Sequence, residues 1–255
     1  MALTNLNPTK RFSSRVDNYV RYRPGYPAEI IELLRSECGL TKDSIIADVG
    51  SGTGKLSELF LKAGCEVFGV EPNKEMREAG ERTDFENFTS IDGTAEATTL
   101  PAHSVDFITA GQAFHWFDHQ KCRAEFVRIL KPGGWTVIVW NDRRGDTTPF
   151  LADYERLLAE FGTDYAQASH RRTDKPEVIR AFFGVEPRFK NFPNVQQFDF
   201  EGLKGRLLSS SYAPEAGQPK HEEMLAALKR IFDARQINGQ VAFEYETHVY
   251  YGHLA

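Results

Sequence analysis

The chain has 255 residues, of which 41% are hydrophobic and 26% are charged, so one α/β domain with an insertion fits it better than two small domains. Its net charge of −5 gives no overall basic field for nucleic acid. Since no apolar run approaches the ~18 residues of a membrane span, and the N-terminus lacks a signal-peptide core, we expect a cytoplasmic protein. We also expect it to be a monomer or a homodimer.

The N-terminal part, residues 1–40, predicts a helical segment. Phe12–Tyr22 has apolar residues at helical spacing and ends before Pro24, which cannot continue a helix. A second, amphipathic helix over Ala28–Cys38 ends at Gly39. Residues 1–10 are polar, and we expect them to be mobile.

The stretch that organises the rest of the chain is Ile45–Glu71. An apolar run over Ser44–Val49 predicts a buried strand and is followed by three glycines at alternate positions. A helical pattern then leads to a second apolar run, Cys65–Val70, which ends at the acid Glu71. A strand, a glycine turn, a helix, a strand and an acid in this order predict half of a nucleotide-binding sheet.

The glycine spacing narrows the ligand class. Gly50, Gly52 and Gly54 form G-x-G-x-G, whereas a dinucleotide-binding loop has G-x-G-x-x-G and would place its third glycine where this chain has Lys55. Glycines let the backbone approach a ligand closely, and an acid at the second strand end can accept hydrogen bonds from both ribose hydroxyls. A pyrophosphate loop and a P-loop are both disfavoured.

Strands and helices alternate through residues 41–141, which predicts parallel βαβ units with ligands over the carboxyl ends of the strands. The further elements expected here are helices over Lys74–Arg82 and Asp118–Leu130 and strands over Phe88–Ile91, Asp106–Ala110 and Trp135–Trp140.

The alternation changes at Asp142. Helices over Pro149–Phe161 and Lys175–Phe183 predict a helical cap spanning residues 142–191. Residues 192–255 are expected to complete the sheet with an antiparallel last strand. Their predicted elements are strands over Val195–Phe200 and Gln240–Tyr251 and helices over Gly202–Ser211 and His221–Arg235.

A set of ordered motifs resembles the class I S-adenosylmethionine-dependent methyltransferases over about residues 40–141. The motifs are Asp48–Gly54, Glu71, Asp92–Glu96, Leu100-Pro101, Val105-Asp106 and Leu130–Gly134. The resemblance implies a Rossmann-like, mostly parallel sheet with helices on both faces. It also implies S-adenosylmethionine as the cofactor.

Three further motifs sharpen this resemblance to a small-molecule subset, methyltransferase type 11, that includes enzymes similar to trans-aconitate methyltransferases. They are Ala113–Asp118, Tyr22–Pro27 and Ser209–Pro214. The implied substrate is a small molecule. A carboxylate acceptor would need no base, because it is ionised at neutral pH.

The resemblance assigns cofactor-binding roles residue by residue. Asp48, Gly50, Ser51, Gly52 and Gly54 would meet the methionine part, and Asp48 would reach its ammonium group directly or through water. Glu71 and Pro72 would lie at the ribose. Met76 would either cover the adenine or belong to the core.

The adenine side departs from the family pattern. Many relatives have an aspartate where this chain has Thr94, whose neutral hydroxyl would accept a weaker hydrogen bond or be only part of a loop. Ala95 would offer its amide to the adenine edge, and Glu96 closes the motif. Gln112 would line the pocket beside the transferable methyl group.

The remaining candidate residues each have a structural alternative. His115 is the first candidate for a general base, or it packs the start of a helix. Tyr19, Tyr22 and Arg23 would close over the cofactor, with Arg23 binding a carboxylate of the cofactor or of an acidic substrate, or they form an exposed helix end. His170–Arg172 fits a solvated loop better than an anion site.

Two other functions compete with this hypothesis. One is an NAD-dependent oxidoreductase, which Lys55 and the later motifs oppose. The other is a non-catalytic cofactor-binding module of the same fold. The three cysteines are far apart and form no C-x-x-C pair, so we expect neither a metal site nor a disulfide.

Overall fold

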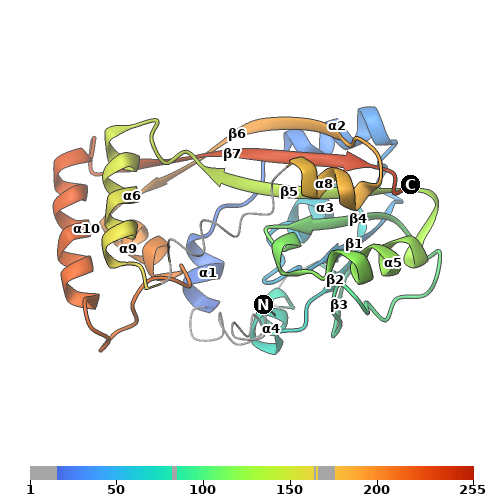
Figure 1. Ribbon diagram of the computed structural model, residues 1–255, viewed down its shortest axis with the longest axis horizontal. Helices are drawn as coiled ribbons and strands as arrows, with labels where there is room; N and C mark the ends of the chain where they lie inside the picture. Colours follow the sequence, from blue (N-terminus) through green and yellow to red (C-terminus); the bar gives the residue numbers. More distant parts are fainter. Residues whose placement is uncertain (1–15, 82–84, 164, 166–175) are drawn as a thin grey trace.

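The computed structural model describes residues 16–81, 85–163, 165 and 176–255. Its centre is a seven-stranded sheet in the order β3-β2-β1-β4-β5-β7-β6 (Figure 1). The strands are β1 Ile45–Val49, β2 Glu66–Val70, β3 Phe88–Ile91, β4 Val105–Gly111, β5 Leu130–Arg143, β6 Arg188–Phe198 and β7 Val241–Gly252.

Five of the strands, β1 to β5, pair in parallel, and β7 runs antiparallel to both of its neighbours, β5 and β6. The described helices are α1 Val16–Tyr22, α2 Glu29–Cys38, α3 Ser57–Lys62, α4 Lys74–Gly80, α5 His119–Ile129, α6 Pro149–Phe161, α8 Pro176–Phe183, α9 Phe200–Leu208 and α10 His221–Arg235, with a 3₁₀ turn, η3, at Phe114–Trp116. The predicted Rossmann-like, mostly parallel fold with an antiparallel last strand is confirmed.

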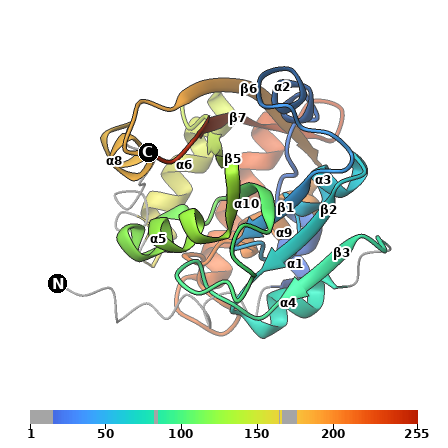
Figure 2. The same cartoon turned by 90° about the vertical axis from the view of Figure 1, so that its right-hand side faces the viewer.

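Helices cover both faces of the sheet (Figure 2). On one face, α5 and α8 bury Phe126 and Phe183 against Ile108 and Ile138. On the other face, α2 and α3 pack against neighbouring strand residues such as Ile46. Alternate residues of each central strand therefore enter different cores, as the pleat of a sheet buried on both sides requires.

A third core lies at the far ends of the long strands. There α6, α9 and α10 lie beside the first half of β7 (Figure 1). Phe243 of β7 is fully buried in this core. The second half of β7 belongs to the parallel part, because Val249 and Tyr251 join the core under α2. β7 therefore ties this helical unit of α6, α9 and α10 to the sheet.

The structure divides residues 142–191 differently from the predicted cap. α6 joins the helical unit, whereas α8 packs beside α5 through Ile179 and Phe182. The predicted boundary at residue 192 falls within β6, which starts at Arg188 rather than at Val195. Phe200 begins α9 instead of ending a strand, because the Asp199 side chain caps the helix by accepting from the Gly202 amide at 2.7 Å.

The N-terminal helix α1 lies between the two halves of the molecule (Figure 1). It contacts α4 on the parallel side and α9 in the helical unit. Residues 1–15, the loop His170–Arg172 and the predicted helix ends at Arg82 and Lys175 lie outside the described residues. None of the helices described is long and apolar enough to cross a membrane.

Candidate active site

The glycine loop begins where β1 ends and is fastened to the end of β2. The amides of Gly50 and Ser51 both donate to the Val70 carbonyl, at 2.8 and 3.1 Å. Gly50, Gly52 and Gly54 all have positive φ angles of 70°, 56° and 80°. A Cβ added to Gly50 would lie 2.5 Å from the Cβ of Ala113, so this position requires glycine both for its φ and for space.

Glu71 holds the same loop from the carboxyl end of β2. Its Oε2 accepts from the Gly52 amide and its Oε1 from the Asn73 amide, each at 2.9 Å. Burial raises the pKa of this carboxyl, although the two amides act in the opposite direction. Each carboxylate oxygen has more than one acceptor position. Glu71 can therefore accept from two further hydroxyl groups, as a ribose would require.

Asp48 lies beneath the loop with no exposed surface. Its carboxylate accepts from the Ser57 hydroxyl at 2.6 Å and from the Thr109 hydroxyl at 3.0 Å. Burial raises the pKa of Asp48 to about 6, and the two hydroxyls only partly oppose that effect. The carboxylate thus ties β1 to α3 and β4, and its contact with a ligand ammonium group remains a prediction.

The start of α4 completes the edge beside Glu71. The Asn73 side chain caps the helix by accepting from the Met76 amide at 2.9 Å, and Pro72 is half-buried between Glu71 and this cap. Met76 is only 5% exposed and joins Val16 in a small core, which favours the core role for this residue. Its Cε would lie 3.3 Å from a Cβ at Gly52, so it also supports the loop.

Arg77 was not identified from the sequence. Its guanidinium donates to the Glu71 carbonyl at 2.8 Å and pairs with Asp92 through two bonds of 3.2 and 3.1 Å. It thereby fixes the end of β2 relative to the end of β3. An arginine that follows the strand-end acid within one or two helical turns is the only sequence signal for this role.

The loop after β3 carries the predicted adenine residues. Thr94 is exposed and forms an isolated two-residue bridge with Ala97, whereas Ala95 is buried. The Glu96 carboxylate accepts from the Asp118 amide at 2.8 Å and so connects this loop to the start of α5. Glu96 therefore has a structural partner, and the exposed Thr94 hydroxyl stays a predicted adenine contact.

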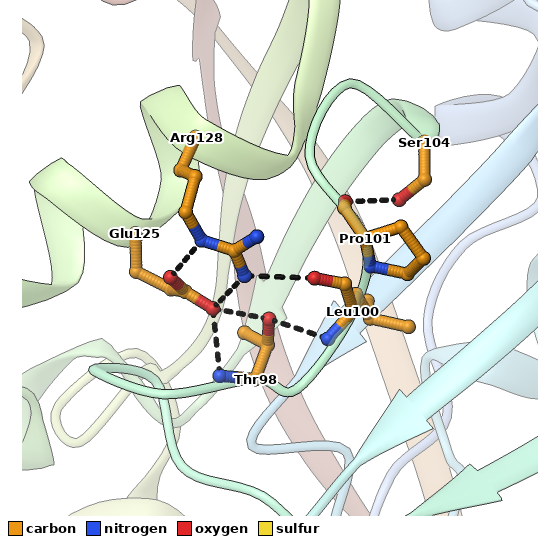
Figure 3. Close-up of polar contacts among 6 residues, drawn as sticks. All are labelled: Thr98, Leu100, Pro101, Ser104, Glu125 and Arg128. Carbon is orange, nitrogen blue, oxygen red and sulfur yellow. Dashed lines mark hydrogen bonds and ion pairs between the residues drawn. The ribbon is translucent and has the colours of Figure 1, made fainter.

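A buried carboxylate on α5 fixes the next part of this loop (Figure 3). Glu125 accepts from the amide and the hydroxyl of Thr98, at 2.8 and 2.5 Å, and pairs with Arg128. Arg128 in turn donates to the Leu100 carbonyl at 2.8 Å. The Arg128 side chain, together with the Thr98 hydrogen bonds, lowers the pKa of Glu125 to about 2. The loop is held by a charged network rather than by regular secondary structure.

Gln112 and His115 follow the end of β4. Gln112 has a positive φ of 56°, which is strained for a residue with a side chain, and donates to the Asn141 carbonyl at 2.8 Å. The His115 ring lies 4.7 Å from the ring centroid of Trp116 and 6.3 Å from that of Trp140. Burial lowers the pKa of His115 to about 4, so its imidazole is neutral at pH 7 and a weak base.

The N-terminal segment reaches the site from the side of α1. Tyr19 packs against the core that contains Met76, and the Arg23 guanidinium lies 5.1 Å from the Tyr19 ring centroid. Tyr22 points into the helical unit, where its ring contacts the backbone of α9 at Gly205. The position of Tyr26 was not predicted from the sequence. Its hydroxyl would lie 2.6 Å from a Cβ added to Gly111 at the end of β4.

These contacts bring the glycine loop, Glu71 and Met76 together at the carboxyl ends of β1 and β2, with Gln112 at the end of β4. Gly50, Ser51, Gly52 and Glu71 are all partly exposed. Close backbone approach and a carboxylate with free acceptor positions suit a nucleoside with a ribose. Among the residues that the structure describes, no group of three or more His, Cys, Asp or Glu side chains could hold a metal ion.

Comparisons with known proteins agree with this geometry. A family model described as a methyltransferase domain matches residues 47–138. An uncharacterized methyltransferase-like protein of Schizosaccharomyces pombe is 33% identical over 223 residues, which cover 87% of this chain and 86% of that protein. An uncharacterized methyltransferase of Mycobacterium tuberculosis is 37% identical over 132 residues, or 52% of each chain.

Solved structures support the fold. A candidate type II methyltransferase from Anaeromyxobacter dehalogenans superposes with a TM-score of 0.65 and 20% identity, over 91% of this chain and 98% of that one. A candidate methyltransferase from an antibiotic biosynthesis pathway of Anabaena variabilis gives a TM-score of 0.61 and 21% identity, over 90% and 98%. None of these comparisons supports the alternative function of an NAD-dependent oxidoreductase. The chain belongs to the class I S-adenosylmethionine-dependent methyltransferases.

Proposed function

We propose that the chain binds S-adenosylmethionine at the carboxyl ends of β1 and β2 and transfers its methyl group to a carboxylate oxygen of a small molecule. The observation that carries the cofactor site is Glu71, which bridges the amides of Gly52 and Asn73 and keeps acceptor positions for two hydroxyls. Family membership supplies the reaction class.

The residues present fit this cofactor. Gly50 and Gly52 lack the side chains that would cover the loop, and Glu71 suits the ribose. The buried Thr53 hydroxyl has no partner among the described residues and adds an unused hydrogen-bonding group to the loop. Ala95 would offer its amide to the adenine, and Gln112 would line the site at the end of β4.

When bound, S-adenosylmethionine would supply a methyl group attached to a positively charged sulfur, and the rest of the cofactor would leave as a neutral thioether. The chain then has to align the acceptor oxygen with that methyl group and exclude water. The strained backbone at Gln112 and its bond to Asn141 fix one wall of the site. The new bond joins the methyl carbon to the acceptor oxygen, and no proton has to be removed from a carboxylate.

The state of His115 supports a carboxylate acceptor. A hydroxyl or amine would need a base with a pKa near the working pH, but burial lowers the pKa of His115 to about 4. His115 instead packs against two tryptophan rings, and no hydrogen bond of its imidazole is found within the described part of the chain. A carboxylate avoids this requirement because it is already ionised at pH 7.

The test is a turnover assay with methyl-labelled S-adenosylmethionine and parallel sets of carboxylic acids, alcohols and amines. The proposal predicts labelled methyl esters formed in equal amounts with the demethylated cofactor. Transfer to alcohols or amines but not to acids would contradict the carboxylate acceptor. Binding of the cofactor without turnover of any class would favour a non-catalytic module.

A further inference from the structure

Three arginines from distant parts of the sequence gather between α1 and the helical unit. Arg23 follows α1, Arg143 ends β5 and Arg206 lies in α9. With Tyr154 of α6 and Tyr212, which follows α9, they form what we call the arginine–tyrosine cluster. Arg23 and Arg143 are attached to elements that also border the proposed cofactor site. Arg23 follows α1, which contacts α4, and Arg143 ends β5, which pairs with β4.

Arg206 is a buried cation, and Arg23 is a partly buried one. Arg206 is only 3% exposed and donates to the Tyr245 hydroxyl at 3.0 Å and the Ser210 hydroxyl at 3.2 Å. Arg23 donates to the Ser209 carbonyl at 2.9 Å, and its buried Nε has no partner in the part of the chain that the structure describes. In the described ranges neither guanidinium forms an ion pair with Asp or Glu. A buried charge in this state carries a desolvation cost that a bound anion would offset.

Arg143 differs from the other two arginines in having an acidic partner, but it also has a buried nitrogen atom without an acceptor among the described residues. One of its nitrogens donates to Glu155 at 2.5 Å and to the Tyr165 hydroxyl at 2.6 Å, but its buried Nε has no partner among the described residues. The Tyr154 ring lies 5.4 Å from this guanidinium, and the fully buried Tyr154 hydroxyl also lacks a partner within the described ranges. Glu155 is thus the one carboxylate found paired with any of these three cations in the described chain.

Tyr212 lies close enough to all three guanidinium groups for their charges to affect the pKa of its phenol. Burial alone would raise the pKa of its phenol, but Arg143, Arg206 and Arg23 together lower it to about 8. The three nearby guanidinium groups give this half-buried position a positive local field. The field has the sign and the donors that a carboxylate needs, because guanidinium groups bind carboxylates through paired N–H donors.

The cluster is connected to the cofactor site through aromatic side chains. The Arg23 guanidinium lies over the Tyr19 ring, and Tyr19 packs on the core that contains Met76 beside the glycine loop. Tyr26 lies close enough to both Asp48 and Arg23 for their charges to affect its pKa. A small molecule held by the arginines therefore lies near the carboxyl edge of the sheet.

We infer that Arg23, Arg143, Arg206 and Tyr212 form an acceptor-binding subsite that holds a carboxylate of the substrate. This inference rests on the proposed function, since it assigns the anchor of the methyl acceptor. A carboxylate bound by several guanidinium groups has its lone pairs engaged and is a poor nucleophile. The anchoring carboxylate is therefore a different group from the one that is methylated, and the substrate class is a small acid with an anionic group remote from the reacting atom.

The test measures binding to the full chain by calorimetry in the presence of S-adenosylhomocysteine. The probes are succinate, glutarate and adipate, their uncharged diamides, and inorganic phosphate. We expect at least one diacid to bind and its diamide not to bind. Arg143→Gln and Arg206→Gln should each weaken diacid binding about 10- to 100-fold, with S-adenosylhomocysteine affinity unchanged.

Arg144→Gln is the matched control, because Arg144 follows Arg143 directly but is 47% exposed and pairs with Glu246 at 3.3 Å. It should leave diacid binding unchanged. Equal loss in Arg144→Gln, equal binding of the diamides, or tighter binding of phosphate would overturn the subsite. Arg206→Lys should retain part of the affinity, which a purely structural role of the guanidinium would not predict. Failure of the wild-type chain to bind S-adenosylhomocysteine would instead overturn the proposed function.

Discussion

The two charged regions of this molecule are built in opposite ways. At the carboxyl ends of β1 and β2, each carboxylate already has donors from the chain: Asp48 has two hydroxyls and Glu71 has two amides. In the arginine–tyrosine cluster, Arg23 and Arg206 have no carboxylate partner among the described residues, and buried nitrogen and oxygen atoms lack any partner.

This difference separates a preformed site from one that needs its ligand. The glycine loop and Glu71 are held in position by backbone bonds, so they can receive a ligand without rearranging. Among the described residues Glu155 is the one carboxylate paired with the three arginines of the cluster, and the desolvation cost of the remaining positive charge would be offset by a bound anion. The comparison thus predicts that substitutions at the loop reduce stability or cofactor binding, while those in the cluster reduce binding of an acid.

The largest effect is expected at Gly50, where the preformed loop allows no side chain. Gly50→Ala combines a positive φ of 70° with a Cβ only 2.5 Å from that of Ala113. We expect it to lower the free energy of unfolding by about 2–5 kcal/mol, measured by urea denaturation. Gly133→Ala has a similar φ of 78° but open space around its Cβ, so it should cost only about 1–2 kcal/mol. Equal losses would show that close packing of the loop is unimportant.

The next effect concerns the ribose position. Glu71→Gln leaves one oxygen in place of two and removes the charge, so the affinity for S-adenosylhomocysteine should fall by about 1.5–3 kcal/mol, measured by calorimetry. Glu66→Gln is the control on the same strand, since Glu66 is exposed at the opposite end of β2. Unchanged affinity in Glu71→Gln would contradict the ribose assignment and leave the loop without its proposed ligand.

Glu125 tests whether the loop after β3 depends on its charged network (Figure 3). Its pKa is lowered to about 2 from the usual 4.5, so its contribution to stability is complete above pH 4.5 and is lost as the pH falls toward 2. Glu125→Gln should cost about 1–3 kcal/mol at pH 7 and show a smaller loss of stability on acidification than the wild type. Parallel pH curves for the two proteins would rule out this role.

The smallest effect is expected at His115. Because its pKa is about 4, it is neutral from pH 6 to 8, and a carboxylate acceptor needs no base. His115→Gln should change kcat by less than about tenfold, or about 1.4 kcal/mol, and leave the pH profile flat in that range. A loss of a hundredfold or more in kcat with unchanged cofactor binding would identify His115 as a general base.

The sequence allowed the cofactor half to be predicted because its signals are local. Apolar runs, alternating glycines and a strand-end acid lie within Ile45–Glu71, and each predicted strand of the parallel part appears in the structure. α6 and α10 are also found where their amphipathic patterns indicate, at Pro149–Phe161 and His221–Arg235. Periodicity and turn chemistry suffice for such elements.

The features that could not be predicted from the sequence depend on long-range packing. β6 starts early, at Arg188, and contains Pro193, which an edge strand tolerates but which hides the strand pattern. The pairing of Asp48 with Thr109 depends on β1 and β4 being neighbours. The arginine–tyrosine cluster could not be predicted either, because only the folded chain brings residues 23, 143, 206 and 212 together.

The most direct measurement is a crystal structure of the chain grown with S-adenosylhomocysteine. We expect both ribose hydroxyls to lie within hydrogen-bonding distance of the Glu71 carboxylate, with the amino-acid part of the ligand against Gly50–Gly52. A ligand bound elsewhere, or a ribose that makes no contact with Glu71, would contradict it.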